Sequence, residues 1–299
     1  MVRELFKAVR INNLILLAFL FASIELFFHF KTNTSTFQNY SLLIYINILI
    51  TAAFGYVIND SFDKKSDQLN EKLNKSKLDS RQLAQSAAFF LLFSILVSLI
   101  YFNKTFFILN LIVSIGLFLY SWKMKHLPLL GNLTIASFSG LCPLIGYINH
   151  PEFQFQISSS ALSINEMYQL SIPFLIGIMA FLSTLSREIV KDLEDIDGDL
   201  AVRSKTLPIL FGKSAAKIIA LFVLICTASL TLFALICKEN YSLSFTTCAS
   251  IVVLLLVPIF TAIVKLFQAN SKADFFKVSN LHKFIFLSAT IVLLTHTFT

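Results

Sequence analysis

Residues 214–236 read SAAKIIALFVLICTASLTLFALI, a stretch in which Lys217 is the only charged residue. About 20 mostly apolar residues in a helix are needed to cross the hydrocarbon layer of a membrane, so this stretch is long enough for one crossing. Comparable stretches recur along the chain. The sequence predicts membrane-spanning helices at residues 12–30, 40–58, 83–102, 105–122, 132–149, 169–187, 214–236, 243–264 and 281–298.

The composition agrees with a location in a membrane. Of the 299 residues, 56% are hydrophobic and only 14% are charged, whereas a soluble domain is about a quarter charged. A large core cannot explain this deficit, because a single domain of this length still exposes many polar side chains. No long segment lacks the apolar pattern, so we expect one all-α polytopic membrane domain over residues 1–299, with about nine transmembrane helices.

The Lys and Arg residues are distributed unevenly between the two sides of the predicted membrane. With the N-terminus in the cytoplasm, the external side receives only three of the 24 basic residues: Lys31, Lys104 and Lys238. Cytoplasmic loops typically carry the excess of Lys and Arg, so we expect an integral protein of the cell inner membrane with a cytoplasmic N-terminus. The asymmetry accounts for much of the net charge of +7, and no nucleic-acid partner is expected.

Most of the acidic residues fall in two predicted cytoplasmic loops, at residues 59–81 and 188–213. The first loop begins NDSFDKKSD at residue 59, and the second contains KDLEDIDGD from residue 191. Each has three aspartates with the spacing i, i+3 and i+7, which a helix would place on one face. The two triplets are Asp60, Asp63 and Asp67, and Asp192, Asp195 and Asp199.

This repeated spacing favours binding of metal ions. Three carboxylates on one face repel one another, which is costly near a phase of low dielectric constant. A divalent cation removes the repulsion, and Mg²⁺ commonly bridges carboxylates to the phosphates of a substrate. A solvated loop with chance spacing would explain either triplet alone. Both triplets begin at the cytoplasmic end of an even-numbered predicted span, and this repetition favours two Mg²⁺ sites.

Basic residues on the same predicted side could bind the oxygens of a diphosphate. Positive-inside topology is the alternative explanation for each of them. The candidates are Arg10 before the first span, Lys125 after the fourth, and Arg187, Lys191, Arg203 and Lys205 around the second triplet.

Together these segments resemble the UbiA-type intramembrane prenyltransferases. Residues 59–67 fit the family's first motif, NDxxDxxxD, and residues 187–199 are similar to its second. Further family-like segments are RINN at 10–13, YSWKMK at 120–125, PLLGN at 128–132 and KTLP at 205–208. The second motif is most similar to that of geranylgeranylglycerol-phosphate geranylgeranyltransferases.

The resemblance implies nine transmembrane helices around a central cavity open to the cytoplasmic face. It also implies transfer of a prenyl group from a prenyl diphosphate to a membrane-associated acceptor, either a glycerol-phosphate lipid or an aromatic ring, among membrane lipids. Mg²⁺ would be held by Asn59, Asp60, Asp63, Asp67, Asp192, Asp195 and Asp199, of which Asp63, Asp67, Asp195 and Asp199 would be catalytic. The substrates would contact Arg10, Asn13, Tyr120, Lys125, Lys191 and Arg203.

Aromatic rings near the motifs could stabilise the allylic cation that forms when the diphosphate leaves. Tyr120 and Tyr56 are candidates, and the depth of Tyr147 argues against it. The chain departs from the family pattern at Gln68, where Arg is usual, and in the following segment 70–77, which lacks the usual Pro and Gly. Ile11 also stands where Pro is usual. The aspartates of both motifs are intact, so we expect activity.

Three other functions stay open at this point. Intramembrane acidic residues often mark ion pathways, but a transporter more often binds its substrate near the midplane, whereas these acidic residues lie at one face. A terpene cyclase could use the same metal and diphosphate chemistry without an acceptor. A catalytically inactive binding protein is supported only by the altered segment after Asp67.

Overall fold

The computed structural model describes residues 2–31, 39–69, 76–148 and 164–299. Within these ranges, the structure describes the backbone but not the side chains of residues 2, 28, 31, 39–41, 65–69, 145–148 and 164–170. Every regular element in the described part of the chain is a helix, which confirms the predicted all-α architecture.

Long helices make up most of the structure. They are α2 (Ile11–Lys31), α3 (Asn39–Leu69), α4 (Ser80–Tyr101), α5 (Lys104–Trp122), α6 (Leu130–Ile148), α8 (Ile164–Glu194), α10 (Leu207–Ile236) and α13 (Lys272–Phe298). A ninth helical column consists of α11 (Phe245–Ser250), the π-helical segment η2 (Ile251–Leu256) and α12 (Val257–Gln268), which follow one another without a break. The short elements are α1 (Val2–Ala8), η1 (Met124–His126) and α9 (Ile196–Ala201).

Seven of these helical columns are long and apolar enough to cross a membrane. Two more apolar segments within the described residues, Ile11–Phe27 in α2 and Leu130–Leu144 in α6, are shorter. Each of the nine predicted spans overlaps one helical column of the described residues, and seven of these columns meet the length and hydropathy needed for a crossing.

The prediction that residues 59–81 and 188–213 are loops is wrong for the acidic motifs. α3 continues through the first motif to Leu69, and α8 continues to Glu194. Contacts one turn apart support these polar ends: Asn59 Nδ2 donates to Asp63 Oδ2 at 2.7 Å, and Lys191 Nζ donates to a Glu188 carboxylate oxygen at 3.1 Å. A drop in hydropathy marks where a helix leaves the apolar layer, and the helix itself can extend beyond that point.

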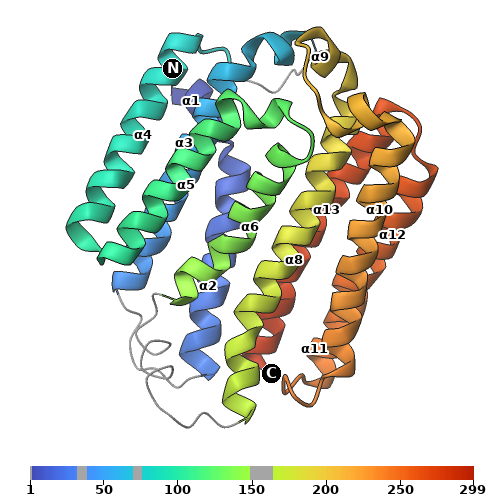
Figure 1. Cartoon of the computed structure of the whole chain (residues 1–299). Coiled ribbons are helices and arrows are strands. Elements are labelled where there is room, and N and C mark those ends of the chain that lie inside the picture. The colour runs from blue at the N-terminus through green and yellow to red at the C-terminus, as the bar shows by residue number, and fades with distance from the viewer. Residues whose placement is uncertain (1, 32–38, 70–75, 149–163) are drawn as a thin grey trace.

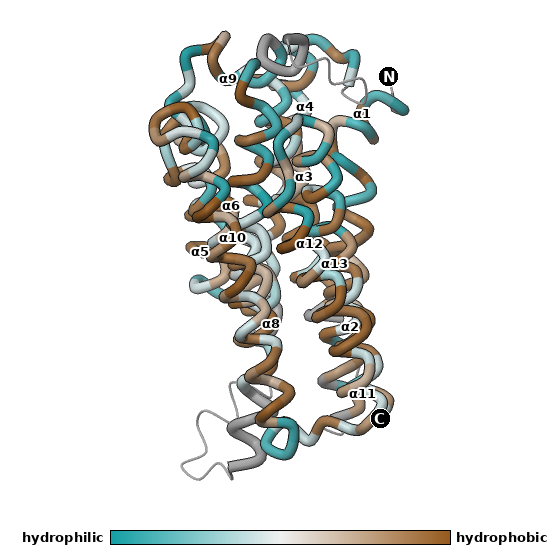
Figure 2. The backbone as a smooth tube through the Cα atoms, turned by 90° about the vertical axis from the view of Figure 1, so that its right-hand side faces the viewer, coloured by the Kyte–Doolittle hydropathy of each residue, from teal (hydrophilic) through white to brown (hydrophobic). Residues whose placement is uncertain are grey.

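The helices run roughly side by side, with the N-terminus at one end of the bundle and the C-terminus at the other (Figure 1). α3 packs against α4 and α5, α6 packs against α8, and α8 packs against α10 and α13, which in turn contacts α2. η1 and α9 lie at the same end as the N-terminus. Figure 2 shows that the hydrophilic residues concentrate at this end, above a long hydrophobic section.

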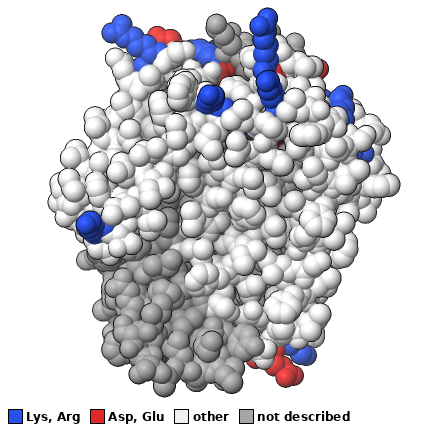
Figure 3. Space-filling model, in the orientation of Figure 1, with Lys and Arg blue, Asp and Glu red and all other residues white. Residues whose placement is uncertain are grey.

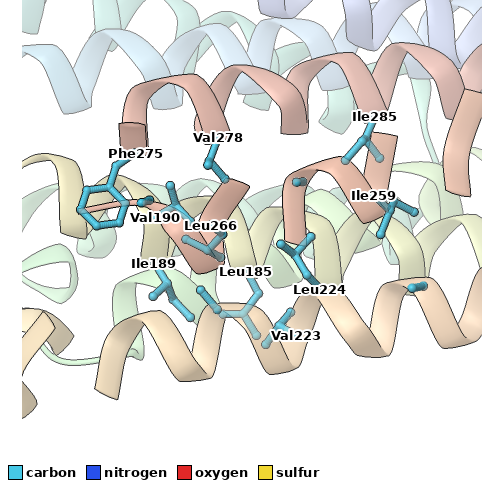
Figure 4. Close-up of a cluster of buried hydrophobic side chains, with 14 of the residues drawn as sticks. Leu185, Ile189, Val190, Val223, Leu224, Ile259, Leu266, Phe275, Val278 and Ile285 are labelled. Carbon is cyan, nitrogen blue, oxygen red and sulfur yellow. The ribbon is translucent and has the colours of Figure 1, made fainter. Parts of the chain in front are cut away.

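Buried apolar side chains fix the position of α8, the helix that carries the second motif. Leu185 and Ile189 of α8 pack among Leu224 of α10, Ile259 of α12 and Val278 of α13 (Figure 4). Fully burying such side chains contributes about 1.5–3 kcal/mol each where the surrounding medium would otherwise be water. Many apolar side chains face outward instead, including Phe89, Leu92, Leu96, Leu99 and Ile100 along α4. An outward apolar surface of this kind suits contact with lipid.

α6 and α8 approach each other closely at two glycines. A Cβ atom built on Gly140 would lie 2.8 Å from the carbonyl oxygen of Gly177, and a Cβ atom on Gly177 would lie 2.8 Å from the carbonyl oxygen of Gly140. Small residues allow this approach between helices in a membrane, where packing and hydrogen bonds provide most of the attraction. The contact holds α6 and η1, which precedes it, next to the second motif.

Candidate active site

A cavity of about 670 Å³ lies between the helices and is lined by residues of both acidic motifs. Its volume is typical of a site for a small ligand, about 300–1,000 Å³. Its charged lining residues are Arg10, Asp63, Lys125, Arg187, Glu188, Lys191, Asp192, Glu194, Asp195, Asp199 and Lys283. Away from these charges the walls are mainly apolar, with side chains such as Leu17 and Leu20 of α2 and Ile176 and Met179 of α8. The cavity could therefore hold an amphiphile with an anionic head and an apolar chain.

The first motif contributes Asn59 and Asp63 to the cavity wall. Asp63 Oδ1 accepts a hydrogen bond from Lys125 Nζ at 2.5 Å, while its other oxygen accepts from Asn59 Nδ2. Asp60 is only 5% exposed and does not line the cavity; it accepts from Arg10 Nη2 at 3.3 Å instead. The side chain of Asp67 lies outside the described residues. The motif thus presents carboxylates already compensated by cations.

Arg10 connects the N-terminal segment to this motif. Its backbone has φ 51°, a left-handed conformation that places it between α1 and α2, and its guanidinium lies 5.0 Å from the centre of the Tyr56 ring. Burial alone would lower the pKa of Arg10, but nearby negative charge, chiefly that of Asp60, raises the pKa well above its usual value. Arg10 therefore stays cationic in the cavity wall, where Asn13 also lies.

Lys125 is carried by η1, which is joined to the segment after α9. The backbone N–H of Lys205 donates to the carbonyl of His126 at 2.9 Å, and Nδ1 of His126 lies 2.7 Å from Ser204 Oγ. Burial and the charge of Lys125 lower the pKa of His126. These contacts link the first motif, through Lys125, to the segment that follows the second.

The second motif is divided between two helices. Asp192 lies in the last turn of α8 and accepts from Asn132 Nδ2 of α6 at 2.9 Å. α8 ends at Glu194, Asp195 lies at the break, and Asp199 lies in α9. The predicted single helical face is therefore wrong for this triplet, because the helix is interrupted inside it. All three aspartates nevertheless line the cavity.

Sequence reasoning assigned no role to several cavity residues. Glu188 is buried and holds two cations on α8: it accepts from Arg187 Nη1 at 2.8 Å and from Lys191 Nζ at 3.1 Å. Lys283 of α13 also lines the cavity, and its position in the last predicted apolar span was a signal, since a charge there is costly unless it is used.

Some of the other residues predicted to contact the substrates line the cavity, and one does not. Lys191, Tyr56 and Tyr120 line the cavity, whereas Arg203 is exposed and lies outside the lining. The side chain of Tyr147 lies outside the described residues.

The donor set fits Mg²⁺ in its chemistry. Oxygen ligands suit this hard cation, and Asp63, Asp192, Asp195 and Asp199 face one cavity. Oδ1 of Asn59 is buried with no hydrogen-bond partner among the described residues, an arrangement that a cation would satisfy. Within the described side chains no three carboxylate, imidazole or thiol groups converge into a finished metal site. An ion bound here would therefore compete with Lys125 for the oxygens of Asp63.

The model of the UbiA prenyltransferase family matches residues 14–287 of the chain. The chain belongs to the UbiA prenyltransferase family. This confirms the resemblance carried by the two motifs.

Curated relatives and solved structures agree with this membership of the UbiA family. The chain is similar to the digeranylgeranylglyceryl phosphate synthases of Thermococcus gammatolerans, at 31% identity over 189 residues, and of Thermococcus kodakarensis, at 33% identity over 190 residues. Each match covers 62% of this chain, and the chain spans only 62% of the length of each relative.

Two solved UbiA homologues share the fold. The apo structure from Aeropyrum pernix K1 has a TM-score of 0.67 at 18% identity and covers 94% of this chain and 97% of that chain. The structure from Archaeoglobus fulgidus, bound to GPP and Mg²⁺, has a TM-score of 0.61 at 17% identity, with 98% and 99% coverage. At these identities the likeness establishes the UbiA fold alone.

Proposed function

We propose that this protein transfers a prenyl group, in a Mg²⁺-dependent reaction, from a prenyl diphosphate to a glycerol-phosphate lipid in the membrane. The observation that carries the proposal is the single cavity, which joins an end rich in carboxylates and cations to walls that are largely apolar. The relatives named digeranylgeranylglyceryl phosphate synthases favour a glycerol-phosphate acceptor over an aromatic ring. The UbiA homologue bound to GPP and Mg²⁺ supports the donor class and the metal.

Residues of both motifs would hold the metal ions. Asn59, Asp63 and Asp67 would serve one ion, and Asp192, Asp195 and Asp199 the other, with Asp60 acting through its contact with Arg10. Held by these carboxylates, Mg²⁺ would supply positive charge that offsets the negative charge growing on the leaving diphosphate. Lys125, Lys191 and Arg10 line the same end and would donate to the remaining oxygens.

The reaction breaks one C–O bond and forms another. The bond between C1 of the prenyl group and the diphosphate breaks, and the diphosphate keeps the electron pair. An oxygen lone pair of the acceptor hydroxyl forms the new ether bond to C1, and the released diphosphate takes up the hydroxyl proton. Tyr120 lies in the cavity wall, where its ring face would stabilise the allylic cation. The Tyr56 ring is already in contact with Arg10, so Tyr120 is the better placed of the two.

The proposal includes an arrangement in the membrane. α2 and α6 would complete nine crossings with the seven longer columns. The end of the bundle that bears α1 and α9 would face the cytoplasm of the cell inner membrane, so that the cavity opens on that side. Lys and Arg gather at this end of the visible face (Figure 3), as expected for a cytoplasmic surface.

The decisive experiment is a transfer assay with purified protein in lipid and Mg²⁺. Radiolabelled prenyl diphosphates of several lengths would be combined with glycerol-phosphate lipids and with aromatic acceptors, with and without a chelator. We expect label to move to a glycerol-phosphate lipid, and the chelator to abolish transfer. Asp63→Asn and Asp195→Asn should each lower kcat at least about a hundredfold, as losses of transition-state charge stabilisation do.

Glu239→Gln is the matched control, because Glu239 is an exposed carboxylate outside the cavity lining. It should transfer at the rate of the wild type. A folded wild-type protein that consumes no donor would contradict the proposal. A product with only isoprenoid carbons would indicate a terpene cyclase, and saturable, gradient-driven uptake into proteoliposomes would indicate a transporter.

A further inference from the structure

α8 and α13 are fixed to each other at one level of the cavity. Nε2 of His282 lies 3.2 Å from Ser186 Oγ, and both residues are buried. Nδ1 of His282 lies 2.9 Å from the carbonyl of Val278, so this nitrogen carries the hydrogen. Ser186 is followed by Arg187 and His282 by Lys283, and both of these cations line the cavity. Two cations from different helices therefore face the cavity close to a rigid contact.

Two polar atoms on the α8 side of this place are buried without a partner. Arg187 Nη1 donates to Glu188, but its Nε has no hydrogen-bond partner among the described residues. The same holds for Oγ of Ser183, which is only 3% exposed, lies one turn earlier on α8 and also lines the cavity. A buried donor left unsatisfied loses the hydrogen bonds that it would make with water, which is unfavourable. Both donors would be satisfied by an anion bound beside them.

Cations outnumber carboxylates at this place, where Arg187, Lys191 and Lys283 stand against Glu188 and Glu194. Lys283 is in electrostatic interaction with Arg187, Arg10 and Glu194. Glu188 holds Arg187 and Lys191 together, so one carboxylate serves two cations on α8. Like charges within reach of one another repel, and a bound anion would relieve that repulsion.

This group of residues lies beyond the place proposed for the diphosphate, and Glu188 links the two places through Arg187 and Lys191. Ser183 and Arg187 precede Asp192 by nine and five residues on the same helix, which at 1.5 Å per residue is about 13.5 and 7.5 Å along the axis. They therefore lie deeper in the bundle than the acidic motifs. Met179, one turn before Ser183, continues the same cavity wall as an apolar surface.

We propose that Arg187, Lys283 and Ser183 form a second anion site, which binds the phosphate of the glycerol-phosphate lipid acceptor. The inference rests on the proposed function and adds the location of the acceptor. The phosphate accepts from Arg187 Nε and Ser183 Oγ and pairs with the Lys283 ammonium. The apolar chain of the acceptor then follows the walls of α8 and α13, and its hydroxyl points toward the donor.

The test separates the Michaelis constants of the two substrates. Lys283→Gln and Arg187→Gln should each raise KM for the glycerol-phosphate lipid at least about tenfold, because each removes a charge-assisted contact. KM for the prenyl diphosphate should change less than about twofold, which is much less than the effect of losing one charge-assisted contact. Lys283→Arg keeps the charge and should restore most of the acceptor affinity. Lys277→Gln, an exposed lysine of α13 outside the cavity lining, is the matched control and should change neither constant.

The lipid alcohol that lacks the phosphate gives an independent readout. It should be a poor acceptor for the wild-type protein, and Lys283→Gln should not make it poorer. Direct binding provides a second readout: radiolabelled glycerol-phosphate lipid, without donor or metal, should bind to wild type and to Asp63→Asn but more weakly to Lys283→Gln. Thermal melting of each variant checks that its fold is intact.

Two results would overturn the site while leaving the proposed function in place. One is an unchanged acceptor KM in both glutamine variants. The other is a rise in donor KM equal to the rise in acceptor KM, which would assign these cations to the diphosphate. Failure of the proposed function has a different signature, because the wild-type protein would then transfer label to no glycerol-phosphate lipid at all.

Discussion

Gly131 lies where the first turn of α6 passes directly behind η1. A Cβ atom at this position would lie 2.7 Å from Lys125 Cα and 3.0 Å from the carbonyl oxygen of Met124. Both are backbone atoms, so they cannot move aside as the end of a flexible side chain can. Glycine at this position therefore determines where Lys125 meets Asp63.

We predict that Gly131→Ala displaces η1 and separates Lys125 from Asp63. A displacement of about 1 Å can cost about a hundredfold in rate, so kcat/KM for the prenyl diphosphate should fall by up to about that factor. Steady-state kinetics with varied donor would measure the change. Leu133→Ala is the control, because Leu133 is on α6 but exposed and outside the cavity lining. Wild-type kinetics in a folded Gly131→Ala variant would show that the position of η1 does not limit the reaction.

Individual site residues differ in how far the sequence could reveal them. Asp63, Asp192, Asp195 and Asp199 were predictable because each belongs to a spaced motif, and all four line the cavity. Ser183 was not predictable, because one hydroxyl in an apolar run gives no signal until the rotation of α8 about its axis is known. Arg203 was predicted as a substrate contact from its place in the sequence, yet its backbone, with φ 57°, leaves the side chain exposed. Its predicted role stays untested.

At the scale of single helices, hydropathy located the apolar sections better than the helix ends. The predicted span 83–102 nearly coincides with α4. The helix is capped by Asp79 just before its first residue and ends at Phe102, close to both ends of the apolar section. The predicted span 169–187 stops seven residues before α8 ends at Glu194. The break at Asp195 could not be read from the sequence, since Ile196 and Asp197 do not exclude a continuous helix.

The pairing of α6 with α8 depends on Gly140 and Gly177. We predict that Gly177→Ala destabilises the protein by about 1–3 kcal/mol, the usual cost of overpacking a well-packed contact, because its Cβ atom would meet the backbone of Gly140. Unfolding in detergent, followed by circular dichroism, would measure the loss. Gly55→Ala is the comparison: its Cβ atom would meet Leu117 Cδ1 at 3.0 Å, and that side chain can move. If both variants lose the same free energy of unfolding, α6 and α8 can move apart to accept the added methyl group, and the close contact at Gly140 and Gly177 is not required for stability.

At the scale of the whole molecule, the placement of the termini and of the charges points to one topology. The N- and C-termini lie at opposite ends of the bundle (Figure 1), as the proposed nine crossings require. The charged residues of both motifs that line the cavity lie near the N-terminal end, and the proposed topology places only Lys31, Lys104 and Lys238 of the 24 basic residues on the other side. The two features are independent, because one depends on the path of the chain and the other on its composition.

Cysteine labelling would test this topology in intact cells. With the four native cysteines replaced, Lys265→Cys near the end of α12 and Glu239→Cys between α10 and α11 place single thiols at opposite ends. We predict that a membrane-impermeant maleimide labels only the thiol at position 239, and that both thiols react once the cells are permeabilised. Since the excess of Lys and Arg resists transfer across the membrane, the thiol at 265 should stay protected. The reverse pattern would place the acidic motifs outside the cell, and labelling of both thiols without permeabilisation would contradict a crossing between positions 239 and 265.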